Sequence, residues 1–288
     1  MEQEIKEEND IKTDLLLEKV KPLKDGVDLH KKIFRPPYQN VLPTPPFRWL
    51  ISGAGQSGKT TLLITILTRF FNNYFDKFYI LSPNINTAQW ERAIEKLGDK
   101  VEIFDDWNEE TEKKLQEIIE EQKESIEENG KLCTNTICFV FDDMVDNLKF
   151  MNSSVLHQLY IRGRHCMASS IFCVQYYNGF PLKLRKNVSA LSIFGSRNKR
   201  EVEALSKEFC HKDITEKQFV QLFDHATSGD YSFLTILPNC TDSRQMYRKG
   251  FCNILEIKKQ PEQNVTVQKR KREDESEVIY NHKKQKIN

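Results

Sequence analysis

Cysteine is too sparse and too scattered in this sequence to build a disulfide framework or a zinc ribbon. The seven cysteines are odd in number, and no two of them stand in CxxC spacing. Long apolar runs are missing too, because no uninterrupted stretch approaches the ~20 residues that span a bilayer. The opening segment, MEQEIKEEND, is acidic and lacks the apolar core of a signal peptide. We therefore expect an intracellular protein of a reducing compartment, with no contact with membranes.

An excess of charge of either sign is also missing. The 288 residues include 43 Lys and Arg against 42 Asp and Glu, a formal net charge of +1. This balance excludes a uniformly basic, histone-like chain, so any surface that binds nucleic acid must be local. We find no internal repeat, and the length suffices for one large domain or two small ones.

Composition divides the chain into three segments. Residues 1–46 are charged at first and then proline-rich, which predicts an extended arm, with a short amphipathic helix around 14–21 as an open alternative. Residues 47–257 have the pattern of a folded domain. Residues 258–288 are polar with two basic clusters, and we expect this tail to be disordered when free.

The middle segment alternates short apolar runs with helical patterns. Near-continuous apolar runs are typical of parallel strands buried on both faces. The predicted strands are 48–53, 77–83, 101–106, 136–143, 169–175, 191–195 and 231–237, with 246–251 as an edge candidate. The predicted helices are 59–71, 87–97, 109–128, 153–165, 198–210 and 215–226. We therefore predict an α/β fold with a mostly parallel central sheet and helices on both faces.

A phosphate-binding loop is the strongest motif. Residues 53–60, GAGQSGKT, match GxxxxGK[ST] and stand directly between a predicted strand and a predicted helix. Such a loop turns successive backbone N–H groups towards a triphosphate, and the helix dipole adds to the attraction. We expect Lys59 to neutralise the β- and γ-phosphates and Thr60 to ligate Mg²⁺. The predicted nucleotide-binding residues are Gly53, Gly55, Gln56, Ser57, Gly58, Lys59, Thr60 and Thr61.

A second acidic motif completes this chemistry. Residues 136–141 form an apolar strand that ends in Asp142 and Asp143, a Walker B pattern. We expect Asp142 to hold Mg²⁺ through water or Thr60, and Asp143 to polarise the attacking water. About 80 residues separate the two motifs, which leaves room for an additional strand between them. That arrangement is typical of the ASCE division of P-loop proteins and disfavours a small nucleotide kinase.

Further candidates flank the next predicted strand. Gln175 ends it, in the position of the polar residue that senses the γ-phosphate in ASCE proteins, with an amide that caps a turn as the alternative. Arg162 and Arg164 precede it and flank a glycine, which indicates a finger that reaches a neighbouring subunit's nucleotide. Ordinary surface charge is the alternative for these arginines. We expect both arginines to project from the carboxyl edge of the sheet. The sequence does not decide which of the two reaches the neighbouring subunit's nucleotide.

The order of these motifs resembles a known family. The stretches that carry the resemblance are PFRWLISGAGQSGKTTLL, FVFDDM, RGRH, SIFCVQYYNGFP and LSIFGSRNKREVEAL, within about residues 46–257. They are similar to the genome-packaging ATPases of large DNA viruses of the poxvirus type and to relatives in virophages and polinton-like elements, all of the FtsK/HerA superfamily. By motif position, the resemblance implies Gly58, Lys59 and Thr60 as phosphate and magnesium ligands, Asp142 as the Walker B acid and Gln175 as the sensor.

The resemblance implies an ASCE, RecA-like P-loop ATPase that translocates double-stranded DNA into a viral capsid. ATP and Mg²⁺ are the expected cofactors. The expected partners are duplex DNA of any sequence, further copies of the chain in a ring, and capsid or portal proteins. The expected location is the host cell, in a viral factory or the nucleus, with association with the virion as a further location. Many superfamily members have Glu after the Walker B Asp, whereas this chain has the shorter Asp143.

Two alternative functions stay open from the sequence. One is another DNA-pumping or helicase ATPase of the same superfamily, and the other is a weakly hydrolysing, nucleotide-binding assembly scaffold. Two local assignments also stay open. Tyr176, Tyr177 and Phe180 are predicted to pack against the following helix, with stacking on DNA as the alternative. The basic residues within 183–186 suit a ring pore and a solvated helix face equally well.

Overall fold

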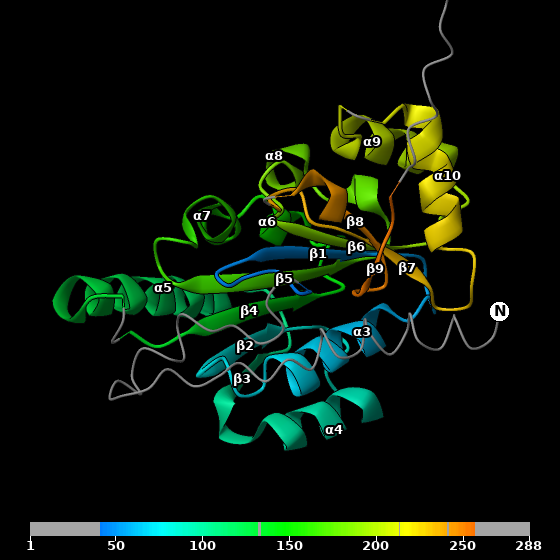
Figure 1. Ribbon diagram of the computed structural model, residues 1–288. Helices are drawn as coiled ribbons and strands as arrows, with labels where there is room; N and C mark the ends of the chain where they lie inside the picture. Colours follow the sequence, from blue (N-terminus) through cyan, green and yellow to red (C-terminus); the bar gives the residue numbers. More distant parts are fainter. Residues whose placement is uncertain (1–40, 132–133, 213, 241, 257–288) are drawn as a thin grey trace, which may run out of the picture. The chain divides into compact units, whose positions relative to one another are not determined.

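The computed structural model describes residues 41–131, 134–212, 214–240 and 242–256. The predicted tail, the helix around 14–21 and most of the arm lie outside these residues. Within them, one nine-stranded sheet lies between two layers of helices, in the strand order β3-β2-β4-β5-β1-β6-β7-β8-β9 (Figure 1). The predicted α/β class and the helices on both faces are confirmed.

Six neighbouring strands are parallel and supply the part of the sheet that holds the motifs. They are β1 (Arg48–Ser52), β2 (Lys77–Leu81), β3 (Val101–Phe104), β4 (Ile137–Asp142), β5 (Ala168–Val174) and β6 (Ala190–Phe194). Three antiparallel strands extend the sheet beyond β6: β7 (Phe233–Ile236), β8 (Tyr247–Lys249) and β9 (Asn253–Ile254). The edge candidate at 246–251 thus forms β8, and the short β9, which was not predicted, takes the edge position.

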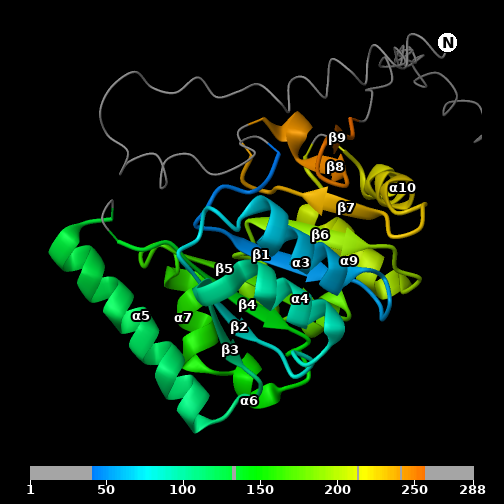
Figure 2. The ribbon, with the colours of Figure 1, turned by 90° about the horizontal axis from the view of Figure 1, so that it is seen from below.

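Helices cover both faces of the sheet. Figures 1 and 2 show α3 and α4 on one face and α7, α8 and α9 on the other. The α-helices are α3 (Lys59–Thr65), α4 (Ala88–Leu97), α5 (Glu109–Asn129), α6 (Leu148–Met151), α7 (Ser154–Arg162), α8 (Leu182–Arg185), α9 (Lys199–Phe209) and α10 (Glu216–Ala226). Single turns of other helix types are η1 (Ile66–Phe70), η2 (Gly98–Lys100), η3 (Tyr177–Gly179) and η4 (Ser243–Gln245). Among the described residues, no helix is both long enough and apolar enough to span a bilayer.

Two predicted helices differ from the structure. The helix predicted at 59–71 is α-helical only to Thr65 and continues as the π-helical turn η1, which ends with the Phe71 N–H donating to the Ile66 carbonyl (3.0 Å). The helix predicted at 153–165 ends at Arg162. Gly163 lies so close to the last turn that a Cβ there would come within 2.4 Å of the Leu159 carbonyl oxygen, and the chain folds away into a tight turn.

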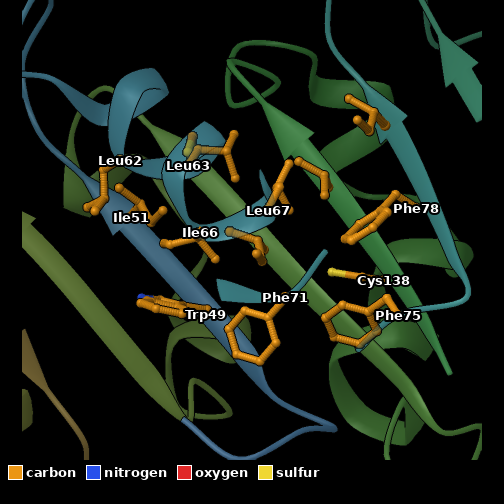
Figure 3. Close-up of a cluster of buried hydrophobic side chains, with 14 of the residues drawn as sticks. Trp49, Ile51, Leu62, Leu63, Ile66, Leu67, Phe71, Phe75, Phe78 and Cys138 are labelled. Atoms are coloured by element: carbon orange, nitrogen blue, oxygen red, sulfur yellow. The ribbon is translucent and has the colours of Figure 1, made fainter. Parts of the chain in front are cut away.

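Apolar side chains fill both sides of the sheet. On one side, Trp49 and Ile51 of β1 pack beneath Leu63, Ile66 and Leu67 of the helix that follows (Figure 3). On the other side, an aromatic cluster joins Phe141, Phe150, Phe172 and Phe180, with ring centroids 4.8–5.7 Å apart where they meet. Because both faces are buried, the strands appear in the sequence as unbroken apolar runs.

The strand order brings three strand ends together. β5 lies between β1 and β4, so the strand of the glycine-rich loop and the strand of the acidic pair are separated by one further strand. This is the predicted ASCE arrangement in space. In sequence, however, β5 follows the acidic motif, and the strands between the two motifs are β2 and β3. In a parallel sheet all carboxyl ends lie at one edge, and ligands of open α/β sheets bind at that edge.

Candidate active site

The glycine-rich loop, residues 53–58, joins β1 to α3 at the carboxyl edge of the sheet. The Gly53 N–H donates to the Val174 carbonyl at the end of β5 (3.2 Å), which continues the sheet pairing into the loop. The Leu62 N–H donates to the Gly58 carbonyl (2.9 Å) and opens the helix. The loop is thus fixed at both ends by backbone hydrogen bonds.

Two glycines of the loop cannot be replaced without strain. A Cβ on Gly53 would lie 2.7 Å from Ser57 Oγ and 2.8 Å from the Phe194 Cβ. Gly58 has φ +99, a left-handed conformation that residues with a Cβ rarely adopt. Ser57 Oγ is buried and has no hydrogen-bond partner among the described residues. A tightly turned loop with an unsatisfied hydroxyl fits the binding of a phosphate group.

The polar residues around the helix start face outward. Lys59 Nζ donates to the Ala54 carbonyl of the loop (2.9 Å), so its cationic head lies over the loop. Thr60 is half-buried, and Thr61 and Gln56 are exposed. Gln56 has φ +62, which adds a second left-handed position to the loop.

Asp142 ends β4 and is almost fully buried, with 4% of its surface exposed. Trp90 of α4 donates its indole N–H to Asp142 Oδ2 (3.2 Å). Burial, with a smaller contribution from the neighbouring carboxylate of Asp143, raises the pKa of Asp142 to about 6, although the hydrogen bonds from Trp90 and Cys173 and the charge of Lys59 act in the opposite direction. A buried carboxylate of this kind is suited to hold a cation, because a bound cation would favour the ionised form.

Asp143 is held between two amides. Gln175 Nε2 donates to Asp143 Oδ1 (2.9 Å), and Asn84 Nδ2 donates to Asp143 Oδ2 (3.2 Å). Its own N–H donates to the Cys173 carbonyl of β5 (3.3 Å). The backbone of Asp143 has φ +61, a conformation that is unfavourable for a residue with a Cβ and is found at functional sites. The structure thus brings the predicted acid and the predicted sensor into direct contact.

The residues present fit Mg²⁺ at this edge. Magnesium prefers oxygen ligands and is commonly held by one or two protein oxygens beside substrate phosphates. The Thr60 hydroxyl at the start of α3 and the Asp142 carboxylate at the end of β4 are oxygen donors of this kind, and the charge of Lys59 acts on Asp142.

Two residues of this site, Asn84 and Trp90, were not predicted from the sequence. Asn84 follows β2, and Trp90 lies in α4, far from the acidic motif in sequence. Their contacts depend on β2 being the sheet neighbour of β4, which the pairing of Leu81 with Phe141 establishes. The sequence does show Asn84 directly after a predicted strand. Only the strand order, with β2 beside β4, shows that this side chain lies near Asp143.

The arginine candidates lie at the opposite edge. Arg162 and Arg164 precede β5, and β5 begins at the level of the first residues of β1, so both arginines belong to the amino edge. The expectation that they project from the carboxyl edge is wrong, because α7 returns the chain to the start of the next parallel strand, as any crossover between parallel strands must. Seven residues of β5 span about 20 Å, so neither side chain reaches the glycine-rich loop of its own subunit.

Arg164 lines a cavity of about 530 Å³ at this amino edge. Arg48, which is 4% exposed, also lines the cavity, and burial together with the charge of Arg164 lowers the pKa of Arg48. Lys186 and Lys212 add further positive charge, whereas Arg185 is paired with Glu208, which also lines the cavity. The cavity is therefore cationic.

The aromatic and basic residues after the sensor divide into buried and exposed groups. Tyr177 and Phe180 are fully buried, which is incompatible with stacking on DNA, while Tyr176 is 48% exposed. Only Tyr177 lies against the following helix α8, as predicted, because the Phe180 ring packs against Tyr160 and Phe172 instead. Arg185 forms an ion pair with Glu208 (2.9 Å) and stacks over the Tyr177 ring. Its charge is thus used inside the subunit, whereas Lys183 and Lys186 are exposed.

The sequence comparison decides the family. The model of the family described as "Poxvirus A32 protein" matches residues 36–271, which is most of the chain. The chain belongs to this family. The resemblance inferred from the motifs is therefore confirmed. A comparison with curated protein sequences finds no significant match.

Solved structures share the fold of this A32-family chain. The genome packaging NTPase B204 of Sulfolobus turreted icosahedral virus 2, in complex with AMP, superposes with a TM-score of 0.53 at 15% identity, covering 72% of this chain and 97% of B204. The DNA-packaging ATPase B204 of Sulfolobus turreted icosahedral virus gives a TM-score of 0.52 at 15% identity with the same coverage. The pCW3 conjugation coupling protein TcpA gives 0.50 at 14% identity, covering 72% of this chain and 61% of TcpA. At these identities the matches establish a common fold.

The buried charge of Asp142 yields a prediction about stability. Asp142→Asn should raise the free energy of unfolding at about pH 8 by on the order of 3 kcal/mol, because the amide removes a desolvated charge and keeps an oxygen for Trp90. The pKa is about 6 in the folded chain against an ordinary value of 3.8. The destabilisation of the parent chain by the buried charge of Asp142 is therefore complete above about pH 6. It is absent below about pH 4, where this carboxyl is protonated in both the folded and the unfolded chain.

Urea unfolding across this pH range measures the difference. The matched control is Asp146→Asn, an exposed acid in the same loop, which should change stability little at any pH. Equal stability of Asp142→Asn and the parent chain at about pH 8 would contradict the assigned burial cost.

Proposed function

We propose that this A32-family protein is an ATPase that uses hydrolysis to move double-stranded DNA into a viral capsid. The observation that carries the proposal is the convergence at one sheet edge of the loop 53–60, the buried Asp142 and the amide-held Asp143. Support also comes from the shared fold with B204, itself described as a genome packaging NTPase, and from the family.

Each residue of the edge has a distinct role in the proposed reaction. Backbone N–H groups of the loop bind the phosphates, and Lys59 offsets the negative charge that spreads over the transferred phosphoryl group. Thr60 and Asp142 hold Mg²⁺, which, when bound, adds positive charge beside the phosphates. Asp143 accepts a hydrogen bond from the attacking water and orients it. The reaction is thus catalysed by position and charge.

Gln175 links this chemistry to the rest of the subunit. Its amide donates to Asp143 and stands at the end of β5, the strand that also accepts the Gly53 N–H. Loss of the γ-phosphate changes the charge beside Asp143 and therefore the hydrogen bonds available to Gln175. We propose that this change is passed to the surfaces that hold DNA, among them the exposed Lys183 and Lys186.

A neighbouring subunit completes the proposed site. Arg162 and Arg164 are exposed, and about 20 Å of strand separates them from their own loop. Either one can therefore act only on the nucleotide of an adjacent copy. Guanidinium groups delivered in this way stabilise the transition state strongly in other phosphoryl-transfer enzymes, by ~10³ or more in rate. Hydrolysis would then depend on assembly into a ring.

Substitutions in the site should separate binding from turnover. Lys59→Ala should abolish nucleotide binding or hydrolysis, because it removes a cation that meets the ground-state phosphates. Asp143→Asn should bind ATP and hydrolyse it much more slowly, since the amide orients water poorly. Equilibrium binding and steady-state hydrolysis measure the two effects, with Asp146→Asn as the control acid from the same loop. Hydrolysis at the parental rate by Asp143→Asn would show that another group positions the water.

DNA should stimulate hydrolysis without regard to base sequence. A packaging motor must grip any stretch of phosphate backbone, so stimulation should fall as salt rises, and duplexes of unrelated sequence should act alike. Steady-state hydrolysis with and without duplex DNA measures the stimulation. Lys59→Ala, which should not hydrolyse ATP, is the control for background hydrolysis. A rate that duplex DNA leaves unchanged would favour a nucleotide-binding scaffold, and strong dependence on one sequence would favour a site-specific regulator.

Mixed subunits test the arginine finger. Arg164→Ala subunits should bind ATP but hydrolyse it slowly, and mixing them with Lys59→Ala subunits should restore part of the activity, since the latter keep their finger. The same mixture with the double variant Lys59→Ala, Arg164→Ala is the control and should restore nothing. Arg162→Ala should be measured beside it. The finger hypothesis fails if mixtures are no more active than their components, or if a dilute monomer hydrolyses ATP at the full rate.

A further inference from the structure

Tyr231 is an exposed aromatic residue beside the phosphate-binding loop. It lies in the connection between α10 and β7, and 73% of its surface is exposed. Its ring and hydroxyl have no hydrogen-bond or aromatic partner among the described residues. The exposed face of its ring is therefore available to a ligand.

The backbone holds Tyr231 in an unfavourable conformation. Its φ is +57, in the left-handed region that residues with a side chain beyond Cβ avoid. The connection is nevertheless well anchored: the Ser232 N–H donates to the Gly229 carbonyl (3.0 Å), and Phe233 begins β7 opposite Phe194 of β6. Backbone strain of this kind persists where the surroundings over-determine it and is concentrated at ligand sites.

The anchored connection places Tyr231 against the loop that binds phosphate. A Cβ built on Gly58 would lie 3.2 Å from Tyr231 Cδ1 and 3.8 Å from its Cβ. Phe194, which pairs with the start of β7, is also 3.7 Å from this built position. The phenol ring therefore lies directly beside Gly58, at the start of α3.

The strand order decides which part of a nucleotide meets this ring. The acids and Gln175 stand on β4 and β5, on one side of β1, whereas Tyr231 precedes β7, beyond β6 on the other side. The γ-phosphate must lie beside Asp143 for hydrolysis. The phosphate chain then crosses the loop at the end of β1, and its ribose and base emerge on the side of β6 and β7.

We propose that Tyr231 forms the base subsite and stacks its ring on the adenine of ATP. The inference rests on the proposed function, because the direction of the phosphate chain follows from the catalytic role of Asp143. Aromatic rings recognise the flat face of a base with little preference among bases. The subsite therefore adds affinity for nucleoside triphosphates in general and leaves selection among bases to other contacts.

The test compares two ligands that share the phosphate chain. Binding of Mg²⁺-ATP and of inorganic tripolyphosphate with Mg²⁺ is measured by calorimetry on the full chain. Tyr231→Ala should weaken ATP binding roughly tenfold, the usual range for loss of one base stack, and leave tripolyphosphate binding unchanged. Tyr231→Phe keeps the ring and should keep most of the ATP affinity. Ile254→Ala, which removes another exposed apolar side chain on the edge strand β9, is the control.

A second substitution guards against a folding defect. Tyr231→Gly suits the left-handed backbone, so it should raise the melting temperature while weakening ATP binding as Tyr231→Ala does. Unchanged ATP affinity in both variants, or equal loss for ATP and tripolyphosphate, would overturn the base subsite. Failure of the parent chain to bind either ligand would instead overturn the proposed function, on which this inference rests.

Discussion

Two backbone hydrogen bonds to the end of β5 hold the whole site together. The Gly53 N–H donates to the Val174 carbonyl and the Asp143 N–H to the Cys173 carbonyl. Each bond continues the pairing of a parallel sheet one residue beyond its strand, and β5 lies between the two strands concerned. One strand therefore separates the glycine-rich loop from the acidic pair. This separation does not depend on the conformation of the long connections between them.

The groups at this edge balance one another electrostatically. Burial disfavours the charge on Asp142, while Lys59 and the indole of Trp90 favour it. Asp143 keeps a left-handed backbone, and Asn84 and Gln175 fix both oxygens of its carboxylate. A site of this kind has its charges in place before substrate arrives, which is the condition under which charge stabilisation is most effective. Tyr231 beside Gly58 fits the same scheme for the base.

Much of this could be predicted from the sequence, because local patterns determine strands and motifs. Apolar runs located the strands, the GxxxxGK[ST] pattern located the loop 53–60, and Asp142 was identified by its place at the end of an apolar run. The contacts of Asn84 and Trp90 could not be found, since they depend on which strands are neighbours, and the exposure of Tyr231 depends on a tertiary turn. Arg164 was predicted at the wrong edge for a related reason. A crossover helix returns the chain to the amino edge before the next parallel strand begins, so a residue that precedes such a strand lies at the amino edge.

The most direct test of the proposed function is a structure of the full chain with Mg²⁺ and a slowly hydrolysed ATP analogue. We expect the β- and γ-phosphates within the loop 53–60, with Mg²⁺ between them and the Thr60 and Asp142 side chains. We also expect a water between Asp143 and the γ-phosphate. Triphosphate bound in the cationic cavity around Arg48 at the amino edge, with the loop left empty, would contradict the proposed function.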